Sequence, residues 1–444
     1  MALRTGQKAQ RALLKAGYEA YLVGGCVRDH LLGLKPKDVD LTTNARPEQI
    51  KAVFGGLPQS DIGERFGTVG ILLDDRWVEI TTYRTEQYQT GSRKPQVEFG
   101  DSLLEDLSRR DFTINAIAMA VDGTIVDPHD GQRDLDAGVI RAVGTASDRF
   151  KEDPLRILRA VRLANQLGFA IDDGTIRGIT QKRDSLVTIS RERVAEELNK
   201  ILLTDLPSFG ILWLERLSLL PHTVPELEAQ IGIHQSPPHH KDVFSHTMLV
   251  VDKTPATLRL RWAALLHDIG KPATKSVEGG AVHFYRHEFV GAEMARDLLH
   301  TLRFGTDFSK EVSSLVALHM RPNLYDRSFG KSAVRRLVRD AGPLLEDLLA
   351  LSRDDITSQQ AQRVEAALAR IDDLEARTKE EEDAVVAVSP LNGEEIMQLT
   401  GYGPGPEIGR LKRALTEMVI EGTLTAGDKP GAVARLKDLT SPES

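Results

Sequence analysis

The spacing of apolar residues changes along the chain, and the first 140 residues mix two periods. Between Tyr21 and Thr43 an apolar run ends at two glycines, a stretch with helical spacing follows, and an alternating stretch closes the segment. Side chains alternate between the two faces of a strand, whereas apolar residues on one face of a helix recur every three or four positions. The segment therefore predicts a strand, a tight turn, a helix over 27–34 and a second strand over 37–43.

Turn residues and periodicity predict the other elements of this region. A helix is predicted over 47–54, and a hairpin is predicted from two alternating runs that meet at Asp74–Asp75. The polar stretch 85–100 contains glycine and proline and predicts a mobile loop. A longer helix is predicted over 103–121, followed by a strand or turn over 123–131. Mixed helices and strands indicate an α/β domain.

From about residue 145 onward the pattern is helical. Apolar spacing predicts helices over 152–169, 191–203 and 208–220, and a proline-rich break follows. A histidine-rich helical block then extends to about residue 375, and an acidic stretch precedes a short helical tail. We therefore expect four parts, which are 1–140 (the head), 141–220 (the neck), 221–375 and 376–444 (the tail).

Composition narrows the class of protein. A chain of 444 residues is too long for one core, so two to four domains are expected. The net charge of −8 argues against nonspecific coating of DNA but allows a local basic surface. No apolar run reaches the roughly 18 residues of a membrane-spanning helix, so no membrane partner is expected. The single cysteine, Cys26, fits a reducing, cytoplasmic location, and we expect it to be a small buried residue rather than a nucleophile.

Asp38 and Asp40 are the first candidates for catalysis, because the predicted strand places both carboxylates on one face beside the glycine turn. Paired carboxylates there suit Mg²⁺ held against phosphates. Glu79 is a candidate third carboxylate, with a place on the hairpin surface as the alternative. A solvent-facing aspartate pair is the competing interpretation. The candidate phosphate contacts are the backbone of Gly24 and Gly25 and the side chain of Arg28.

A second cluster lies in RRDFTINA, residues 109–116. On the predicted helix Asp111 and Asn115 share a face, and Arg110 reaches round to it. A guanidinium there would clamp phosphate, and the amide of Asn115 would bind a ribose. A capping arrangement at the start of a helix, built on Asp111, is the alternative.

The segment Glu152–Arg156 carries a pair of side chains that can select a nucleobase. Asp153 and Arg156 are three residues apart, so a helix would present them on one face. A carboxylate accepts from the exocyclic amine of cytosine or adenine, and a guanidinium donates to the adjacent ring nitrogen. Uracil and guanine reverse both groups, so the pair accepts C and A and rejects U and G. A surface ion pair between the two side chains is the alternative.

Three long patterns occur in order along the chain, and they are GGxVRDxLLGxxxxDxDxxT at 24–43, RRDFTINA at 109–116 and EDxLRxxRA from Glu152. Over residues 20 to about 205 the chain thereby resembles the class II tRNA nucleotidyltransferases, which include CCA-adding enzymes and bacterial poly(A) polymerases. The resemblance implies a polymerase β-like α/β nucleotidyltransferase head followed by all-α neck, HD and tail domains. It also implies Mg²⁺ in the head, CTP and ATP as substrates, and the acceptor stem and 3′ end of tRNA as partner.

The resemblance also implies roles for residues of the neck. It makes Asp153 and Arg156 a protein template for the incoming base, and it places Arg159 among the nucleotide-binding residues as a support of the template helix. The length of the loop 85–100 favours a CCA-adding or A-adding enzyme over a CC-adding one, although Gly91–Ser92 stands where an aspartate- and arginine-rich sequence is common. The tail is expected to bind tRNA.

Ten of the 12 histidines lie between His222 and His319. Imidazole and carboxylate ligands suit Ni, Mn, Co, Fe or Zn, and open positions on such a metal activate water against a phosphoester. The order H…HD…H…H…D resembles HD-superfamily phosphohydrolases, and its residues here are His246, His267, Asp268, His287, His319 and Asp355. Asp354 competes with Asp355 for the last position of this pattern, which we assign to Asp355 on resemblance alone. The alternative is that this histidine-rich block only helps to hold tRNA.

We therefore expect a tRNA nucleotidyltransferase that adds C and A to tRNA 3′ ends, with a second phosphohydrolase activity on 2′,3′-cyclic phosphates or phosphate-damaged tRNA ends. The alternatives within the class are a partial A-adding or CC-adding enzyme and a poly(A) polymerase. The alternative from another class is an HD phosphohydrolase whose head senses nucleotides. The sequence leaves the oligomeric state open.

Overall fold

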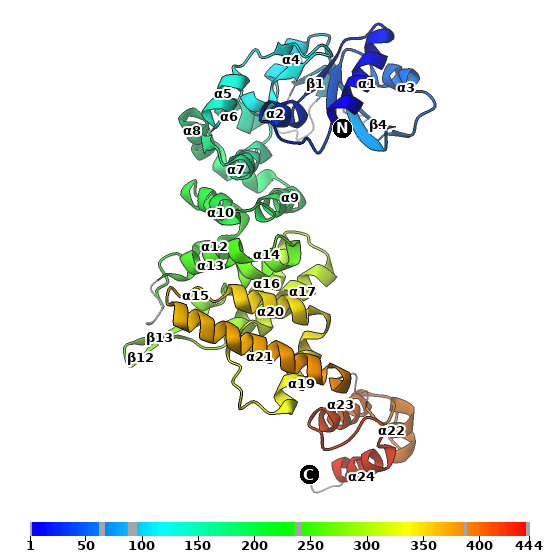
Figure 1. Ribbon diagram of the computed structural model, residues 1–444, viewed down its shortest axis with the longest axis vertical. Helices are drawn as coiled ribbons and strands as arrows, with labels where there is room; N and C mark the ends of the chain where they lie inside the picture. The colour runs from blue at the N-terminus through cyan, green and yellow to red at the C-terminus, as the bar shows by residue number, and fades with distance from the viewer. Residues whose placement is uncertain (1, 62–66, 88–95, 236–240, 386–388, 441–444) are drawn as a thin grey trace. The chain divides into compact units, whose positions relative to one another are not determined.

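The computed structural model describes residues 2–61, 67–87, 96–235, 241–385 and 389–440 (Figure 1). Contacts between Cα atoms divide the chain into two compact units, Met1–Pro225 and Glu226–Ser444. None of the helices in the described ranges combines the length and the apolar character needed to cross a membrane.

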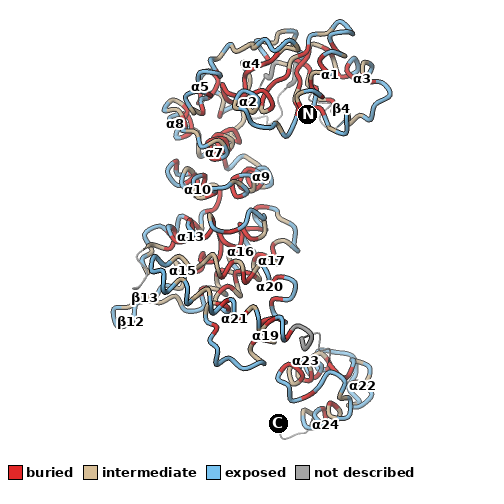
Figure 2. The backbone as a smooth tube through the Cα atoms, in the orientation of Figure 1, coloured by how far each residue is buried: buried red, intermediate tan, exposed pale blue. Residues whose placement is uncertain are grey.

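A seven-stranded sheet forms the centre of the head. Its strand order is β3-β4-β5-β2-β1-β8-β9, and Figure 2 shows buried residues at the centre of the head. β2 runs parallel to β5, and the other neighbours are antiparallel. The α/β fold expected for the head is confirmed. The strands are β1 (Ala20–Val23), β2 (Asp40–Thr43), β3 (Gln59–Ser60), β4 (Thr68–Leu73), β5 (Arg76–Thr82), β8 (Ala118–Met119) and β9 (Ile125–Val126).

The predicted hairpin is confirmed in β4 and β5. Asp74 and Asp75 connect the two strands, and both have positive φ, 51° and 58°. A two-residue turn with two such residues matches the right-handed twist of the strands, and aspartate tolerates the conformation better than most residues.

The predicted loop 85–100 begins and ends as a second hairpin. β6 (Arg84–Gln87) pairs antiparallel with β7 (Gln96–Phe99). The stretch expected to be a mobile loop therefore has strands at its two ends, and these strands satisfy each other's backbone groups. Gly91–Ser92, where the sequence departs from the common pattern, lies outside the described residues.

Short helices pack around the sheet, and α1, α2 and α3 contact its strands. On α4 the side chain of Leu107 packs in one buried cluster with Val23 and Ala118. The helix predicted over 27–34 begins earlier, at Gly25, and the helix predicted over 47–54 is confirmed. The helices of the head are α1 (Ala2–Lys15), α2 (Gly25–Leu31), α3 (Pro47–Val53), α4 (Leu103–Ser108) and α5 (Gly131–Ala137).

The long helix predicted over 103–121 is wrong. Helix α4 ends at Ser108, a single 3₁₀ turn η2 (Thr113–Asn115) follows, and the chain then enters β8. Phe112 forms a β-bridge to Ala142, and the run from Phe112 to Ala118 is buried. A segment that is buried on every side has no amphipathic period, so spacing alone could not distinguish a helix from buried turns and a strand.

The helix predicted over 152–169 is interrupted at its start. Asp153 has an extended backbone, with φ −139° and ψ 102°, and Pro154 stands before α7. Proline disfavours the helical conformation in the residue before it, so α6 ends at Glu152 and α7 begins at Leu155. The neck elements are β10 (Val139–Ile140), α6 (Ala146–Glu152), α7 (Leu155–Leu167), β11 (Ala170–Ile171), α8 (Asp173–Lys182), η3 (Arg183–Thr188), α9 (Arg191–Leu202), α10 (Pro207–Arg216), α11 (Leu220–Thr223) and α12 (Pro225–Glu228).

Within its described residues, the second unit is helical, as expected, apart from one β-hairpin and an isolated β-bridge. Helix α16 packs against α17, and α14 packs against both α13 and α17. Its first elements are α13 (Val243–Lys253), α14 (Leu258–Leu266), α15 (Lys271–Thr274), β12 (Lys275–Glu278), β13 (Ala281–Phe284), α16 (His287–Thr301), α17 (Thr306–Leu318), α18 (Met320–Asn323), α19 (Lys331–Ala341), η4 (Gly342–Leu344) and α20 (Leu345–Asp354).

The acidic stretch expected to be a solvated helix or linker belongs to helix α21 (Ala361–Val385). One face of this helix is buried, with Ile371 and Leu374 in the core, and buried Glu381 accepts a hydrogen bond of 2.6 Å from Arg335. The tail helices share a separate apolar cluster that includes Leu411. They are α22 (Gly393–Thr400), α23 (Pro406–Ile420) and α24 (Lys429–Thr440).

Candidate active site and metal centre

The turn between β1 and α2 requires glycine. Gly24 has φ 72° and ψ −139°, a conformation that residues with a Cβ atom rarely adopt. A Cβ atom at this position would lie 3.2 Å from Nη1 of Arg110 and 3.6 Å from Oδ2 of Asp40. The backbone of the turn is therefore in close contact with the side chains that a bound phosphate would face.

The register of β2 against β5 places Asp40 directly beside Glu79. Burial, and next the charge of Glu79, raise the pKa of Asp40 to about 6, although Arg110 acts in the opposite direction. A partly buried carboxylate beside a second carboxylate is an environment that a bound cation would stabilise. The structure therefore fits a divalent metal held by these oxygens.

The position of Asp38 differs from the prediction. Strand β2 begins at Asp40, so Asp38 lies in the bend before it and is exposed, and the two do not share a strand face. Within the described residues, three or more candidate ligand atoms within 4.8 Å of one another occur only in the second unit. Asp38, Asp40 and Glu79 therefore do not form a compact group of ligand atoms, although Asp40 and Glu79 are register partners.

A cavity of about 940 Å³ opens between this part of the head and the first helices of the neck. Ten of the predicted residues line it, which are Gly24, Gly25, Asp40, Glu79, Arg110, Asp111, Asn115, Asp153, Arg156 and Arg159. Asp38 and Arg28 are not among the lining residues of the described chain. Arg84, Arg109 and Glu152 also line the cavity and were not among the predicted residues. Arg109 and Glu152 stand at the start of RRDFTINA and EDxLRxxRA, so the motifs contained them, whereas Arg84 lies outside every motif.

Asp111 and Asn115 meet, although not on a helix. The Nδ2 of Asn115 donates to Oδ1 of Asp111 over 3.1 Å, and Arg28 donates to Oδ1 of Asn115 over 2.9 Å. Burial alone would raise the pKa of Asp111, but Arg159 and the hydrogen bond from Asn115 hold it well below its usual range. This chain of polar contacts joins the helix after the glycine turn to the first neck helix.

Asp153 and Arg156 lie on the cavity wall, but each has partners other than the other. Arg193 donates to Oδ2 of Asp153 over 2.9 Å. Arg156 donates to Oε2 of Glu152 over 2.6 Å and to the backbone oxygen of Arg109 over 3.0 Å. Instead of the surface ion pair with each other that was the alternative, Asp153 and Arg156 have separate hydrogen-bond partners, which anchor them. These anchors hold both side chains at the cavity.

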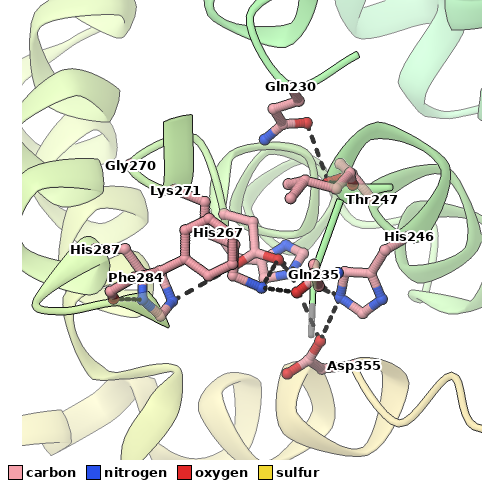
Figure 3. A network of polar contacts seen from close by, with 12 residues as sticks. Gln230, Gln235, His246, Thr247, His267, Gly270, Lys271, Phe284, His287 and Asp355 are labelled. Carbon is pink, nitrogen blue, oxygen red and sulfur yellow. Dashed lines mark hydrogen bonds and ion pairs between the residues drawn. The ribbon is translucent and has the colours of Figure 1, made fainter. Parts of the chain in front are cut away.

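The six HD-pattern residues, called the HD centre below, come together in the second unit. They form two groups of ligand atoms, His246–His267–Asp355 and Asp268–His287–His319, each within 4.8 Å. Most of these residues stand at helix ends, so the lengths of α14, α16, α17 and α20 determine where the ligands meet. Figure 3 shows His246 and His267 directed toward Asp355.

The histidines of the HD centre are oriented through their outer nitrogens. In three of them Nδ1 donates to a backbone oxygen, which leaves Nε2 as the inward acceptor that a metal requires. His246 uses Nδ1 toward Oγ1 of Thr357 at 2.8 Å. The three backbone contacts are His267 to Ala264 at 2.8 Å, His287 to Phe284 at 2.8 Å and His319 to Val316 at 2.7 Å.

Two inward-facing pairs of Nε2 atoms result. Within each pair the two Nε2 atoms are 3.3 Å apart, and the pairs are His246 with His267 and His287 with His319. Two nitrogen ligands of one tetrahedral ion stand about 3.4 Å apart when each metal–nitrogen bond is about 2.1 Å. Asp268 is buried between the pairs. Its Oδ2 lies 3.2 Å from Nε2 of His267, and its Oδ1 lies 3.4 Å from Nε2 of His287.

The charges of the centre also fit a cation. Burial alone would lower the pKa of His267, but Asp268 and Asp355 raise it to about 10, so without a metal its Nε2 holds a proton, and a bound cation would take the place of that proton. The nitrogen-rich ligand set suits a transition metal better than Mg²⁺. Asp355 faces the histidines, whereas Asp354 lies half-buried outside the groups of ligand atoms. His239 and His240, which belong to the same histidine-rich block, lie outside the described residues.

Cys26 is buried beneath the glycine turn. Burial raises the pKa of its thiol to about 11, so the thiolate needed for nucleophilic chemistry is scarce at neutral pH. The structure agrees with the expectation of a small packing residue.

Comparison with known proteins agrees with this architecture. Family models match the poly A polymerase head domain at residues 20–141, a probable RNA- and SrmB-binding site of polymerase A at 168–231, and the HD domain at 239–385. A CCA-adding enzyme of Lactiplantibacillus plantarum is 33% identical over 374 residues, which are 80% of this chain and 91% of that protein. The chain belongs to the family of CCA-adding tRNA nucleotidyltransferases.

Further relatives include two kinds of tRNA nucleotidyltransferase. An A-adding enzyme of Deinococcus radiodurans is 35% identical over 419 residues, which are 90% of this chain and 91% of that one. The solved structure of Bacillus stearothermophilus CCA-adding enzyme in complex with CTP has a TM-score of 0.70 and 27% identity, and the match covers 99% of this chain and 97% of that one. The resemblance inferred from the sequence is confirmed, and the protein is a nucleotidyltransferase.

Proposed function

We propose that this nucleotidyltransferase adds both C and A to the 3′ ends of tRNA, using CTP and ATP without a nucleic-acid template. One observation carries the proposal, namely that Asp153 and Arg156 share a cavity with Asp40 and Glu79. A base-selecting pair and a carboxylate pair in one cavity can hold the two ends of one nucleoside triphosphate. The complex of the B. stearothermophilus relative with CTP supports this interpretation.

The residues of the cavity divide the work of the reaction. Asp40 and Glu79, with Asp38 close by, would hold Mg²⁺, which neutralises triphosphate charge and favours ionisation of the tRNA 3′-hydroxyl. The backbone at Gly24 admits phosphate, and Arg110 stabilises the negative charge of the pyrophosphate as it leaves. The 3′-oxygen forms the new bond to the α-phosphorus as the bond to pyrophosphate breaks.

Base selection rests on the anchored pair. The carboxylate of Asp153 accepts from the amine of cytosine or adenine, and Arg156 donates to the adjacent ring nitrogen. Arg193 and Glu152 restrict the rotation of these two side chains, so the pair is preorganised when a base enters.

The proposal is tested by the products formed on three tRNAs, ending at the discriminator base, at C and at CC. With CTP and ATP together we expect every substrate to end in CCA. With ATP alone, only the CC-ended tRNA should be extended. If ATP extends that tRNA but CTP extends none of the three, the protein is an A-adding enzyme, the name of the D. radiodurans relative. Long adenosine tracts would indicate a poly(A) polymerase.

Replacing the templating carboxylate should reduce activity with both correct nucleotides. We expect Asp153→Ala to lower kcat/KM for CTP and ATP by about ten- to a hundredfold, because a hydrogen bond to a charged group is lost. The preference for CTP over UTP should fall with it. Steady-state incorporation on CC-ended and C-ended tRNA measures both. Asp148→Ala, an exposed carboxylate on α6, is the matched control, and an unchanged preference in Asp153→Ala would contradict the template role.

We also propose that the HD centre is a metal-dependent phosphohydrolase acting on phosphorylated tRNA 3′ ends, including 2′,3′-cyclic phosphates. The observation that favours it is the set of inward Nε2 atoms around buried Asp268. A bound transition metal would supply an activated water and polarise the phosphoester. Lys271, whose Nζ lies 2.7 Å from Asp268, would hold a phosphate oxygen.

A further inference from the structure

A buried carboxylate lies behind the active-site arginines of the head. Asp106, on α4, is fully buried and does not line the cavity. Its Oδ1 accepts from Nε and Nη2 of Arg109, at 3.0 and 2.6 Å. Its Oδ2 accepts from Nη2 of Arg110 at 3.3 Å and from Oγ1 of Thr42 at 3.1 Å. One side chain therefore connects both arginines to the strand that carries Asp40.

The contacts of Arg110 leave part of its guanidinium available to a ligand. Nη1 lies next to the glycine turn, within 3.2 Å of where a Cβ atom of Gly24 would be. The buried Nε of Arg110 has no hydrogen-bond partner among the described residues. This Nε is enclosed by protein, so the donor that a phosphate in the cavity would engage is Nη1, whose hydrogen bond to the backbone oxygen of Asn115 is long, at 3.5 Å.

Arg109 also connects Asp106 to Arg156, in the part of the cavity that would select the base. The backbone oxygen of Arg109 accepts from Nη2 of Arg156 at 3.0 Å. Arg109 therefore contacts Asp106 through its side chain and Arg156 through its backbone. Its contacts thus join the phosphate-facing and base-facing ends of the cavity.

The electrostatics show that the group acts as an anion. Burial alone would raise the pKa of Asp106, but Arg110 and Arg109 hold it below its usual range. A buried ionised carboxylate with four donors directed at it is costly to form and is strongly destabilised by the loss of one partner. Such a group fixes the geometry of its partners more effectively than a surface ion pair.

We propose that Asp106 is the positioning residue of the triphosphate site, and that it orients the guanidinium groups of Arg109 and Arg110 toward the β- and γ-phosphates of CTP and ATP. The inference rests on the proposed nucleotidyl transfer in this cavity. Asp106 contacts neither substrate nor metal ligand, and it acts through the two arginines. Its removal should therefore weaken recognition of the phosphates and leave recognition of tRNA unchanged.

The first test is Asp106→Asn in the full-length protein. Asparagine keeps the shape but turns one acceptor into a donor that opposes a guanidinium. We expect KM for CTP and for ATP to rise by about tenfold or more, since a misplaced binding group loses much of its effect. The inhibition constant of pyrophosphate should rise by the same factor, while KM for tRNA stays within twofold. Glu105→Gln, an exposed carboxylate on the same helix, is the matched control.

A merely structural role predicts a different result. Partial unfolding would lower the fraction of active enzyme and therefore kcat, while KM for the nucleotides and the inhibition constant of pyrophosphate would stay unchanged. Those two unchanged constants would overturn the inference. Asp40→Asn distinguishes this from failure of the proposed function, because incorporation retained in that variant would overturn the reaction site itself.

A double-mutant cycle gives a second test. It measures the binding of CTP by calorimetry at low temperature, so it can also be used if Asp106→Asn folds poorly at the temperature of the activity assay. Arg110→Gln should weaken CTP and pyrophosphate on its own. Asp106→Asn introduced into Arg110→Gln should add less than its full single effect on a logarithmic scale, because part of its action passes through Arg110 and the rest through Arg109. Fully multiplicative effects would contradict the inference.

Discussion

Asp40→Asn is expected to reduce nucleotide incorporation by about a thousandfold or more, since it removes a metal-holding charge from the centre of the reaction. The carboxylate stands beside Glu79 in the β2–β5 register and borders the cavity. Asparagine preserves the shape of the side chain, so the loss reports chemistry and not packing. Incorporation of labelled CTP and ATP into CC-ended and C-ended tRNA measures the effect, and hydrolysis by the HD centre should be unchanged.

The Asp40→Asn substitution should leave the stability of the fold unchanged or increase it. The pKa of Asp40 is raised to about 6 in the folded chain, so folding disfavours the ionised form that predominates at neutral pH. Asparagine removes that penalty, and thermal unfolding should occur at the same or a higher temperature. Asp75→Asn is the matched control, because Asp75 is an exposed turn residue whose φ of 58° suits asparagine. Full activity in Asp40→Asn would refute the proposed site.

The second large effect is expected at the HD centre. His267→Gln should remove most of the bound transition metal and reduce phosphodiesterase activity on 2′,3′-cyclic phosphates by about a hundredfold or more, because an inner ligand is lost. His267 is buried, with Nε2 3.3 Å from Nε2 of His246. Metal content by mass spectrometry and hydrolysis of 2′,3′-cyclic AMP give independent readouts. CCA addition should be unchanged.

His283→Gln is the control for this substitution, because His283 lies on β13 outside the two groups of ligand atoms. It should keep both the metal and the hydrolytic activity. Metal bound without any hydrolysis in the unmodified protein would assign the centre a structural role. Hydrolysis that persists in His267→Gln, with no metal present, would contradict the proposed chemistry.

Local patterns predicted ten of the residues that line the cavity. The glycine turn, RRDFTINA and the Asp153–Arg156 pair are contiguous motifs, and their lining residues follow from residue type and short spacing. The hairpin turn at Asp74–Asp75 was equally local, since two residues suffice to specify it. The longest wrong element was the helix over 103–121, whose buried residues carry no amphipathic period.

The ligand order of the HD centre was readable in the same way, but its geometry was not. Six residues spread over more than a hundred positions meet because helix lengths and packing bring their ends together. Which atoms face inward depends on backbone oxygens such as that of Ala264, which fix each imidazole. The preference for Asp355 over Asp354 rested on resemblance, and the structure supplies a geometric reason for it.

The sequence by itself determined which kinds of residue take part, because chemistry such as phosphate binding and base pairing depends on side-chain type and short spacing. Only the tertiary structure decided how these residues are paired. The β2–β5 register joins Asp40 to Glu79, the break at Pro154 separates Asp153 from the helix of Arg156, and Asp106 joins two arginines to Thr42. Such contacts link positions far apart along the chain, and they follow from the packing of whole elements, which no local pattern records.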